Sequence, residues 1–302
     1  MKLVLLFFVL SIFVINNLAQ TNYNYDVTDW QIVAEDCEFP EGPAYDGKGN
    51  LYFSNCYGSW IGKYDGIVAK KFLSKSDSSF TISKTNGLTF GRDGFIYACD
   101  YGIGAILKIS PEGSSEILID GYYNVKFNRP NDLAFSPSGK LFFTDPKSYD
   151  KNNLDGRIFK YDFKSNKTEL ISEGLGFPNG IAFSPNGKYL FVCESALQRV
   201  LKYEINVDEK LSSPKAIIDL PGGDPDGIAF DVNGNLWIAH FGGKAVYVVT
   251  QSGELISKIE TPGMKPSNLE FGGLEMKTLF LTETETNKVY QLNVDVPGLK
   301  LF

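Results

Sequence analysis

The chain repeats one pattern of polar and apolar positions six times. Each copy starts with a polar residue, carries apolar residues at its third and fifth positions, turns, and continues into a second apolar run. Residues 177–194, FPNGIAFSPNGKYLFVCE, are a clear copy. Two such runs joined by Pro, Asn and Gly predict a β-hairpin. The copies begin at Glu41, Asn86, Asn131, Asn179, Asp226 and Ser267.

The spacing of the copies, 41 to 48 residues, predicts the architecture. Two further strand-like runs lie between hairpins, for example residues 157–161 and 168–172. Four strands in a repeat of this length are typical of a β-propeller blade. We therefore expect an all-β, six-bladed propeller over residues 21–302, as a single domain. Residues 31–35 match the fourth strand of a blade and should complete the last blade, which covers an open sheet edge.

The start of the chain predicts a signal peptide. Lys2 is followed by an apolar run over residues 3–15 and a small residue near position 19. This pattern over residues 1–20 predicts secretion or delivery to the secretory-pathway lumen. The run is short for a membrane span, so stable membrane insertion is not expected, and an uncleaved anchor is the alternative. The net charge of −7 without a basic cluster argues against a nucleic-acid partner.

Two features fit an oxidising compartment. Cys37 and Cys56 flank the first hairpin at one end, which predicts a disulfide between them, whereas Cys99 and Cys193 are expected as buried thiols. Asn166 lies in a glycosylation sequon, in the turn of an outer hairpin.

The first residues of the six copies are the candidate metal site. Equivalent positions of six blades converge at one height of the channel, which predicts a ring of side-chain oxygens. Two carboxylates, Glu41 and Asp226, with amide oxygens such as Asn131 and Asn179, form a hard ligand set. Such a set prefers Ca²⁺, with Mg²⁺ or Mn²⁺ as competitors, whereas Zn²⁺ would be unusual without His or Cys. The alternative is that these residues only form turns.

A second polar ring lies about fourteen residues further on, where each second strand ends. Its members are Asn55, Asp100, Asp145, Glu194, His240 and Glu283. We expect Asp100, Asp145 and His240 to contact a ligand above the metal. His240, the single histidine of the chain, is either a proton shuttle or a hydrogen-bonded structural residue.

Five motifs, taken in order, resemble the senescence marker protein/gluconolactonase family, which includes regucalcin. They are Glu41-Gly-Pro, Arg129-Pro-Asn-Asp132, Thr144-Asp-Pro146, Phe177-Pro-Asn-Gly180 and Asp224-Pro-Asp-Gly227. The resemblance implies a six-bladed propeller with one divalent cation in its channel. It maps the metal ligands to Glu41, Asn179 and Asp226, with Asn131 beside the metal. It also implies substrate contact by Arg129, to which Asp132 of the same motif is added, and a catalytic base at Asp226. Cys99-Asp-Tyr-Gly102 departs from the Cys-Glu-His-Gly of bacterial members, which bears on the substrate.

The function predicted from the sequence is metal-dependent hydrolysis of a small-molecule lactone or ester. The cation would polarise the carbonyl, and Asp226, or a carboxylate of the second ring such as Asp145, would activate water. Arg129 would bind the hydroxyls or carboxylate of a sugar acid. The chain has no Gly-x-Ser-x-Gly elbow. Two alternatives remain open: a strictosidine-synthase-like propeller enzyme without a metal, and a secreted, non-catalytic propeller that binds calcium.

Overall fold

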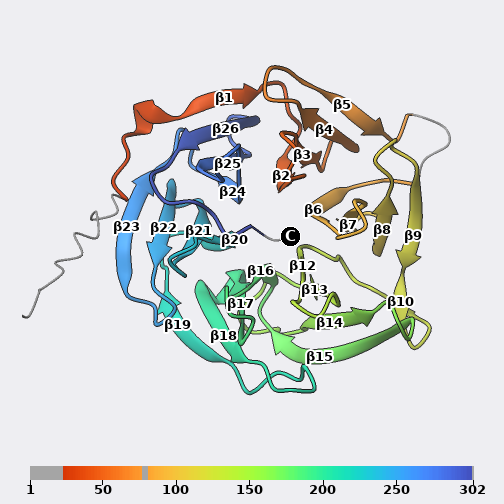
Figure 1. Ribbon diagram of the computed structural model, residues 1–302. Helices are drawn as coiled ribbons and strands as arrows, with labels where there is room; N and C mark the ends of the chain where they lie inside the picture. The colour runs from red at the N-terminus through yellow and green to blue at the C-terminus, as the bar shows by residue number, and fades with distance from the viewer. Residues whose placement is uncertain (1–22, 77–80, 301–302) are drawn as a thin grey trace, which may run out of the picture.

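The computed structural model describes residues 23–76 and 81–300 and contains six four-stranded antiparallel sheets around one axis (Figure 1). The predicted six-bladed propeller is confirmed. In chain order, blade 1 contains β2 (Pro40–Tyr45), β3 (Leu51–Asn55), β4 (Trp60–Tyr64) and β5 (Ala69–Ser74). Blade 2 contains β6 (Thr85–Phe90), β7 (Ile96–Asp100), β8 (Ala105–Ile109) and β9 (Ser115–Ile119). Blade 3 contains β12 (Leu133–Phe135), β13 (Leu141–Asp145), β14 (Gly156–Asp162) and β15 (Lys167–Leu175).

The second half of the ring repeats this order. Blade 4 contains β16 (Pro178–Phe183), β17 (Tyr189–Glu194), β18 (Arg199–Glu204) and β19 (Lys215–Asp219). Blade 5 contains β20 (Asp224–Phe230), β21 (Leu236–Phe241), β22 (Ala245–Val249) and β23 (Leu255–Glu260). Blade 6 contains β24 (Pro266–Gly272), β25 (Thr278–Glu283), β26 (Lys288–Asn293) and β1 (Gln31–Ala34). A small hairpin, β10 (Gly121–Tyr122) and β11 (Val125–Lys126), and two short 3₁₀ turns, η1 (Val27–Asp29) and η2 (Ser195–Leu197), lie outside the blades.

The N-terminal strand closes the ring, as predicted. β1 pairs antiparallel with β26, with Gln31 opposite Gln291 and Ile32 opposite Tyr290. Trp30, just before β1, is 8% exposed and packs into the core between blades 5 and 6. Its indole Nε1 donates a hydrogen bond to the carbonyl oxygen of Glu260 at 3.0 Å. The strand and its tryptophan therefore join the two ends of the ring.

Aromatic pairs hold neighbouring blades together. The aromatic residue at the fifth position of each repeat packs on a ring from the second strand of the preceding blade, with centroids 5.0 to 6.4 Å apart. Five of these pairs are edge-to-face, and the pair at the closure is stacked. Such pairs stabilise the contact between blades beyond what the buried apolar area alone contributes. The pairs are Tyr52–Phe90, Tyr97–Phe135, Phe142–Phe183, Phe191–Phe230, Trp237–Phe271 and Phe280–Tyr45.

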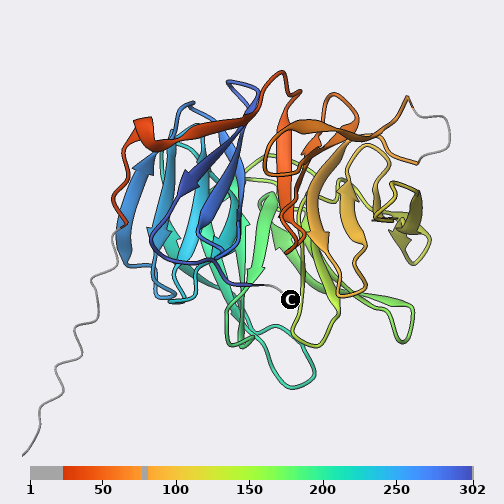
Figure 2. The same cartoon turned by 45° about the horizontal axis from the view of Figure 1, so that its top comes forward.

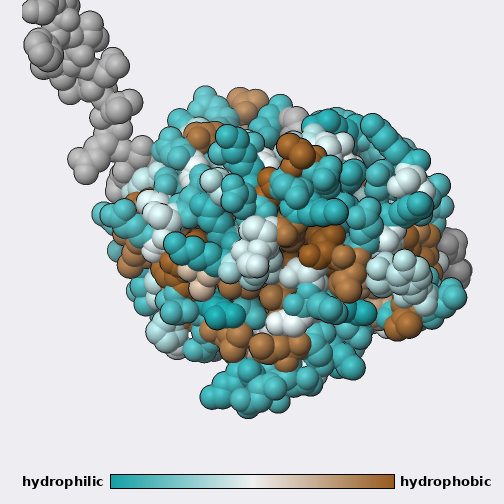
Figure 3. All heavy atoms as spheres, turned by 90° about the horizontal axis from the view of Figure 1, so that it is seen from below, coloured by the Kyte–Doolittle hydropathy of each residue, from teal (hydrophilic) through white to brown (hydrophobic). Residues whose placement is uncertain are grey.

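The strands run between the two faces of the ring, as the tilted view in Figure 2 shows. We call the face where each first strand begins the site face, and the opposite one, where it turns into the second strand, the turn face. The surface in Figure 3 is mostly hydrophilic, with apolar side chains in small groups. Within residues 23–76 and 81–300, no helix has the length and apolar character needed to cross a membrane.

The other sequence predictions have different outcomes. Residues 1–20, the predicted signal peptide, lie outside the described residues. Cys99 and Cys193 are buried free thiols, as predicted. The predicted Cys37–Cys56 disulfide is wrong in this structure, where both residues are free and buried. Cys37 packs into the hydrophobic core with its Sγ near the carbonyl of Glu35, whereas Cys56 lines a pocket on the site face, so the thiols have different surroundings.

The sequon at Asn166 lies where the sequence predicted. Asn166 is exposed in the turn between β14 and β15 and has a φ of 51°. Its side-chain oxygen accepts a hydrogen bond from the Tyr161 hydroxyl at 3.2 Å. Glycosylation at this residue stays a prediction.

We expect Trp30→Ala to destabilise the protein by about 3–5 kcal/mol, because the change leaves a cavity and an unpaired carbonyl at the ring closure. Ile32→Ala is the matched control on β1, since Ile32 is 50% exposed, and should change stability by less than about 0.5–1 kcal/mol. Urea unfolding followed by tryptophan fluorescence and circular dichroism measures both. An equal loss of stability in the two variants would contradict the role of Trp30 in closing the ring.

Candidate active site on the propeller axis

Five of the six first-position residues converge in one pocket on the site face. Glu41, Asn86, Asn131, Asn179 and Asp226 all line this pocket, whose volume is about 250 Å³. The sixth, Ser267, is fully buried, and its hydroxyl donates to the carbonyl of Pro40 at 2.8 Å. The predicted ring of polar side chains is therefore present in five blades. In blade 6 the equivalent residue forms a hydrogen bond to blade 1 and does not line the pocket.

Glycines bring these residues together. A Cβ added to Gly42 would lie 2.1 Å from the carbonyl oxygen of Asn86, and one added to Gly180 would lie 2.2 Å from that of Asp226. The backbones of neighbouring inner strands therefore approach too closely for any side chain at these positions. The glycine after the first position narrows the channel where the polar ring lies.

The two carboxylates of the ring are buried without a positive partner. Glu41 is 5% exposed and Asp226 is 7% exposed. Burial, followed by the negative charge of Asp132, raises the pKa of Glu41 to about 8. Burial also raises the pKa of Asp226, followed by repulsion from Glu41, while a hydrogen bond from the Asn179 side chain lowers it. No lysine or arginine among the described residues forms an ion pair with either acid.

This arrangement fits a divalent cation. Two buried acids that repel each other are stabilised either by protonation or by a positive ion between them. Amide oxygens of Asn86, Asn131 and Asn179 complete a hard oxygen set of the kind Ca²⁺ prefers. In the described part of the chain, no three His, Cys, Asp or Glu side chains gather as a metal cluster. A cation here would thus depend on the amides as well as the two acids.

Aromatic rings form the wall above the ring of oxygens. The residues are Phe39, Tyr57, Tyr101, Tyr149, Phe177 and Phe241. Arg129 is the one basic residue of the lining, and Asp224 lines the same pocket. The pocket is therefore polar and acidic at its base and aromatic at its mouth.

Asp132 does not reach this pocket, which corrects its predicted contact with substrate. Its side chain hydrogen-bonds that of Asn268. The two residues belong to blades 3 and 6, which are opposite in a six-bladed ring, so the bond crosses the channel. Both line a second cavity of about 840 Å³ that shares no lining residue with the site-face pocket. Burial raises the pKa of Asp132 to about 7.

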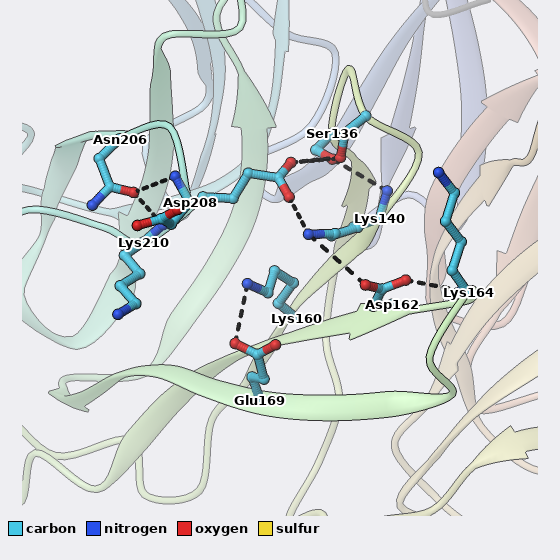
Figure 4. A network of polar contacts seen from close by, with 11 residues as sticks. Ser136, Lys140, Lys160, Asp162, Lys164, Glu169, Asn206, Asp208 and Lys210 are labelled. Atoms are coloured by element: carbon cyan, nitrogen blue, oxygen red, sulfur yellow. Dashed lines mark hydrogen bonds and ion pairs between the residues drawn. The ribbon is translucent and has the colours of Figure 1, made fainter.

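The larger cavity opens on the turn face. Glu270 lines it, and burial raises the pKa of this carboxyl to about 8. At its mouth, Lys140 forms an ion pair with Glu209 at 2.6 Å and lies 3.9 Å from Asp162 (Figure 4). Ser136 and Ser138 also donate to Glu209. This network ties the loop after β18 to blade 3.

The second polar ring is structural, which corrects the predicted ligand contacts of Asp100, Asp145 and His240. Each member holds the loop that leads into the first strand of its own blade. Asp100 accepts from the backbone N–H groups of Ser83 and Lys84, and Asp145 accepts from that of Arg129. His240 is 1% exposed, and its Nε2–H donates to the carbonyl of Leu220 at 2.9 Å. Asn55, Glu194 and Glu283 accept in the same way from Glu38, Gly176 and Lys265.

Comparison with known proteins shows the family of the chain. A family model described as SMP-30/Gluconolactonase/LRE-like region matches residues 39–285. The chain belongs to this family. The gluconolactonase of Zymomonas mobilis is 30% identical over 285 residues, which cover 84% of this chain and 79% of the relative. The predicted resemblance is thereby confirmed.

Other relatives of this SMP-30/gluconolactonase chain differ in their named activity. The diisopropyl-fluorophosphatase of Loligo vulgaris is 27% identical, covering 89% of this chain and 93% of that protein. Strictosidine synthase-like protein 7 of Arabidopsis thaliana is 30% identical, covering 66% of this chain and 56% of that protein. Among solved structures, a gluconolactonase from Xanthomonas campestris superposes with a TM-score of 0.77 at 24% identity, covering 88% of this chain and 89% of that one, which shows the fold.

Sequence reasoning missed the aromatic wall and the Asp132–Asn268 bridge. The bridge had a signal, because the second position of the repeat is Gly in four blades and Asp or Asn in blades 3 and 6. The wall had a weaker signal in the Phe-Pro pair that precedes both Glu41 and Asn179.

We expect Asp100→Asn to destabilise the fold by about 1–3 kcal/mol and to leave the KM of any substrate unchanged. One Asp100 oxygen accepts from Lys84, Gly102 and Ile103, and the other accepts from Ser83 at 2.6 Å. In the variant, the side-chain NH₂ group of asparagine would face one of these backbone N–H groups, and two donors cannot form a hydrogen bond. Chemical denaturation measures the loss, with Asp208→Asn on an exposed loop as control; a raised KM with unchanged stability would restore Asp100 as a substrate contact.

We expect Glu270→Gln to become progressively more stabilising between pH 5 and 8. The folded wild-type protein holds this proton up to about pH 8, whereas a free glutamate loses it near 4.5. Folding of the wild type therefore weakens as pH rises through this window, and the variant lacks the effect. Denaturation at pH 5, 7 and 9 should show a gain of about 1–3 kcal/mol at pH 9. A pH-independent difference would contradict the raised pKa.

Proposed function

We propose that the protein is a divalent-cation-dependent hydrolase of small lactones or esters, with the cation held by Glu41, Asn131, Asn179 and Asp226. One observation carries this proposal: two buried acids, Glu41 and Asp226, line one pocket beside amide side chains and repel each other, and neither has a basic partner among the described residues. The relatives named gluconolactonase, and the pentonolactonase of Haloferax volcanii at 24% identity over 85% of both chains, support hydrolysis of a lactone. Ca²⁺ is the ion proposed, with Mg²⁺, Mn²⁺ and Zn²⁺ as alternatives to test.

A bound cation would supply positive charge that polarises the substrate carbonyl and stabilises the negative charge developing on its oxygen. The side chains have separate tasks. Asp226, oriented by its hydrogen bond with Asn179, accepts a proton from the attacking water as a general base. The water oxygen bonds to the carbonyl carbon, the ester C–O bond breaks, and the departing alkoxide takes the proton from Asp226. The products are an alcohol and a carboxylic acid, which releases its proton to solvent and leaves as the carboxylate.

The pocket walls fix the substrate. Asn86 and Asn131 are placed to donate amide N–H groups to the substrate oxygens, because both line the pocket base. Arg129 is exposed at the rim, where it can attract a carboxylate or hydroxyl of the acyl part. The backbone N–H of Arg129 donates to buried Asp145 at 2.8 Å, so the loop that carries Arg129 is held in place. Asp145 acts on the substrate only through this loop.

A strictosidine-synthase-like reaction is the second candidate, because one named relative is 30% identical over 211 residues. Such a reaction needs no cation, so Glu41 and Asp226 would remain protonated in the buried pocket. We further propose, from the signal peptide that the sequence predicts at residues 1–20, that the protein works outside the cytosol, where millimolar calcium would be available to a site of modest affinity.

Metal removal tests the proposal. Turnover of δ-gluconolactone and 4-nitrophenyl acetate should fall at least about 100-fold after chelation and return with one of Ca²⁺, Mg²⁺, Mn²⁺ or Zn²⁺. Asp226→Asn should lower kcat/KM by about 10²–10⁴-fold, and Asp295→Asn, on the exposed C-terminal segment, should not. Calorimetry and thermal unfolding give readouts besides activity: the same cation should bind and raise the Tm of the wild type but not of a Glu41→Gln/Asp226→Asn variant.

The outcomes separate the candidates. Cation binding without turnover of any ester would favour a non-catalytic calcium-binding propeller. Full activity in chelator would remove the cation from the mechanism. Strictosidine synthase activity in chelator would favour the second candidate.

A further inference from the structure

The mouth of the site-face pocket is built mostly from aromatic rings. Six of its sixteen lining residues are Phe or Tyr; five come from loops, and Phe241 is the last residue of β21, so that five different blades contribute. Tyr57 and Tyr149 are more than half exposed, at 59% and 58%. Exposed rings gathered around a polar base are unusual unless they contact a ligand. We propose that the substrate carries a flat apolar group, as in an aryl lactone or aryl ester, held between these rings; this inference rests on the hydrolase function proposed above.

Two phenylalanines are held at the mouth by unfavourable backbone conformations. Phe39 has a φ of 62° and Phe177 a φ of 56°. Bulky residues rarely adopt this left-handed region, and a following proline disfavours helical backbone further. Both precede a proline and then a ring residue, Glu41 or Asn179. Strain of this kind persists where the surrounding structure enforces it, and it is concentrated at functional sites.

The two phenylalanines lie on opposite sides of the ring. Phe39 leads into blade 1 and Phe177 leads into blade 4, which are three blades apart. Phe39 packs on Tyr57, with centroids 4.4 Å apart, and lies 6.5 Å from Phe241. Phe177 packs edge-to-face on Tyr149 at 5.4 Å. Because both groups line one small pocket, a flat substituent entering it meets aromatic surface on two sides.

The polar groups at this height are few. The hydroxyl of Tyr149 is engaged with Asp224. Lys84 lies 5.5 Å from the centroids of both Tyr57 and Tyr101 and stays over those rings. Arg129, which has no ion-pair partner among the described residues, remains, together with the hydroxyls of Tyr57 and Tyr101. A polyhydroxylated lactone would place several hydroxyls against rings with few partners for them, which weakens binding, whereas an aryl group loses nothing there.

The test compares two lactones on the cation-loaded full-length protein. Dihydrocoumarin carries a fused aromatic ring, and δ-gluconolactone carries hydroxyls on a ring of the same size. We expect kcat/KM for dihydrocoumarin to exceed that for δ-gluconolactone by at least about tenfold, mainly through a lower KM, since each ring contact is worth up to about a factor of ten.

Three variants assign the preference to the rings. Phe177→Leu should raise the KM for dihydrocoumarin about five- to tenfold, with kcat changed less than about threefold and δ-gluconolactone nearly unaffected. Phe177→Tyr should restore the KM, because it keeps the ring. Phe163→Leu, the same change on the turn face, is the matched control and should leave both substrates unchanged.

Each result decides something. A preference for δ-gluconolactone would overturn the aryl assignment and leave the hydrolase intact. A preference for dihydrocoumarin that Phe177→Leu does not reduce would overturn the role of Phe177. Turnover of neither lactone with any of the four cations would overturn the proposed function and this inference together. Thermal unfolding of each variant separates a specific loss from misfolding.

Discussion

The contact between inner-strand backbones at the axis is the constraint on which the site depends. Gly42 lies against Asn86, Gly180 against Asp226 and Gly227 against Asn268, each with too little space for a Cβ. This approach brings side chains from 41 to 226 in the sequence to one small pocket. It also requires a closed ring, since a missing blade contact would let the inner strands separate. The aromatic pairs between blades and the strand that follows Trp30 therefore support the chemistry as well as the fold.

The site works against the stability of the protein that carries it. Burial and mutual repulsion disfavour the charged forms of Glu41 and Asp226, and no basic residue of the described chain offsets them. A protein selected for stability alone would place apolar residues here, as it does two and four positions further along each strand. A cation would reverse the effect, because it is attracted to the charges that repel one another. Activity, cation affinity and stability are thus expected to change together when either acid is altered.

The repeat made most of the fold and the base of the site predictable. Equivalent positions in six similar units must lie at one height, so Glu41, Asn131, Asn179 and Asp226 could be placed together without coordinates. The same reasoning failed for Asp100, Asp145 and His240, because a polar residue at a strand end serves equally well to hold a neighbouring loop. Most of the aromatic wall lies in loops that differ from blade to blade, so the repeat signals only the Phe-Pro pairs at Phe39 and Phe177. The disulfide failed because proximity along a hairpin does not determine which way two thiols point.

The second position of the repeat divides the channel into two compartments. In four blades this position is glycine, whereas Asp132 and Asn268 occupy it in the two opposite blades 3 and 6. Their side chains lie over Gly87 and Gly227 of the preceding blades and bond to each other across the axis. A ligand therefore reaches the oxygen ring from the site face, through the aromatic mouth. The larger cavity on the turn face is separate from this pocket. Since the inner strands crowd together most closely at this height, two polar side chains are enough to bridge the channel.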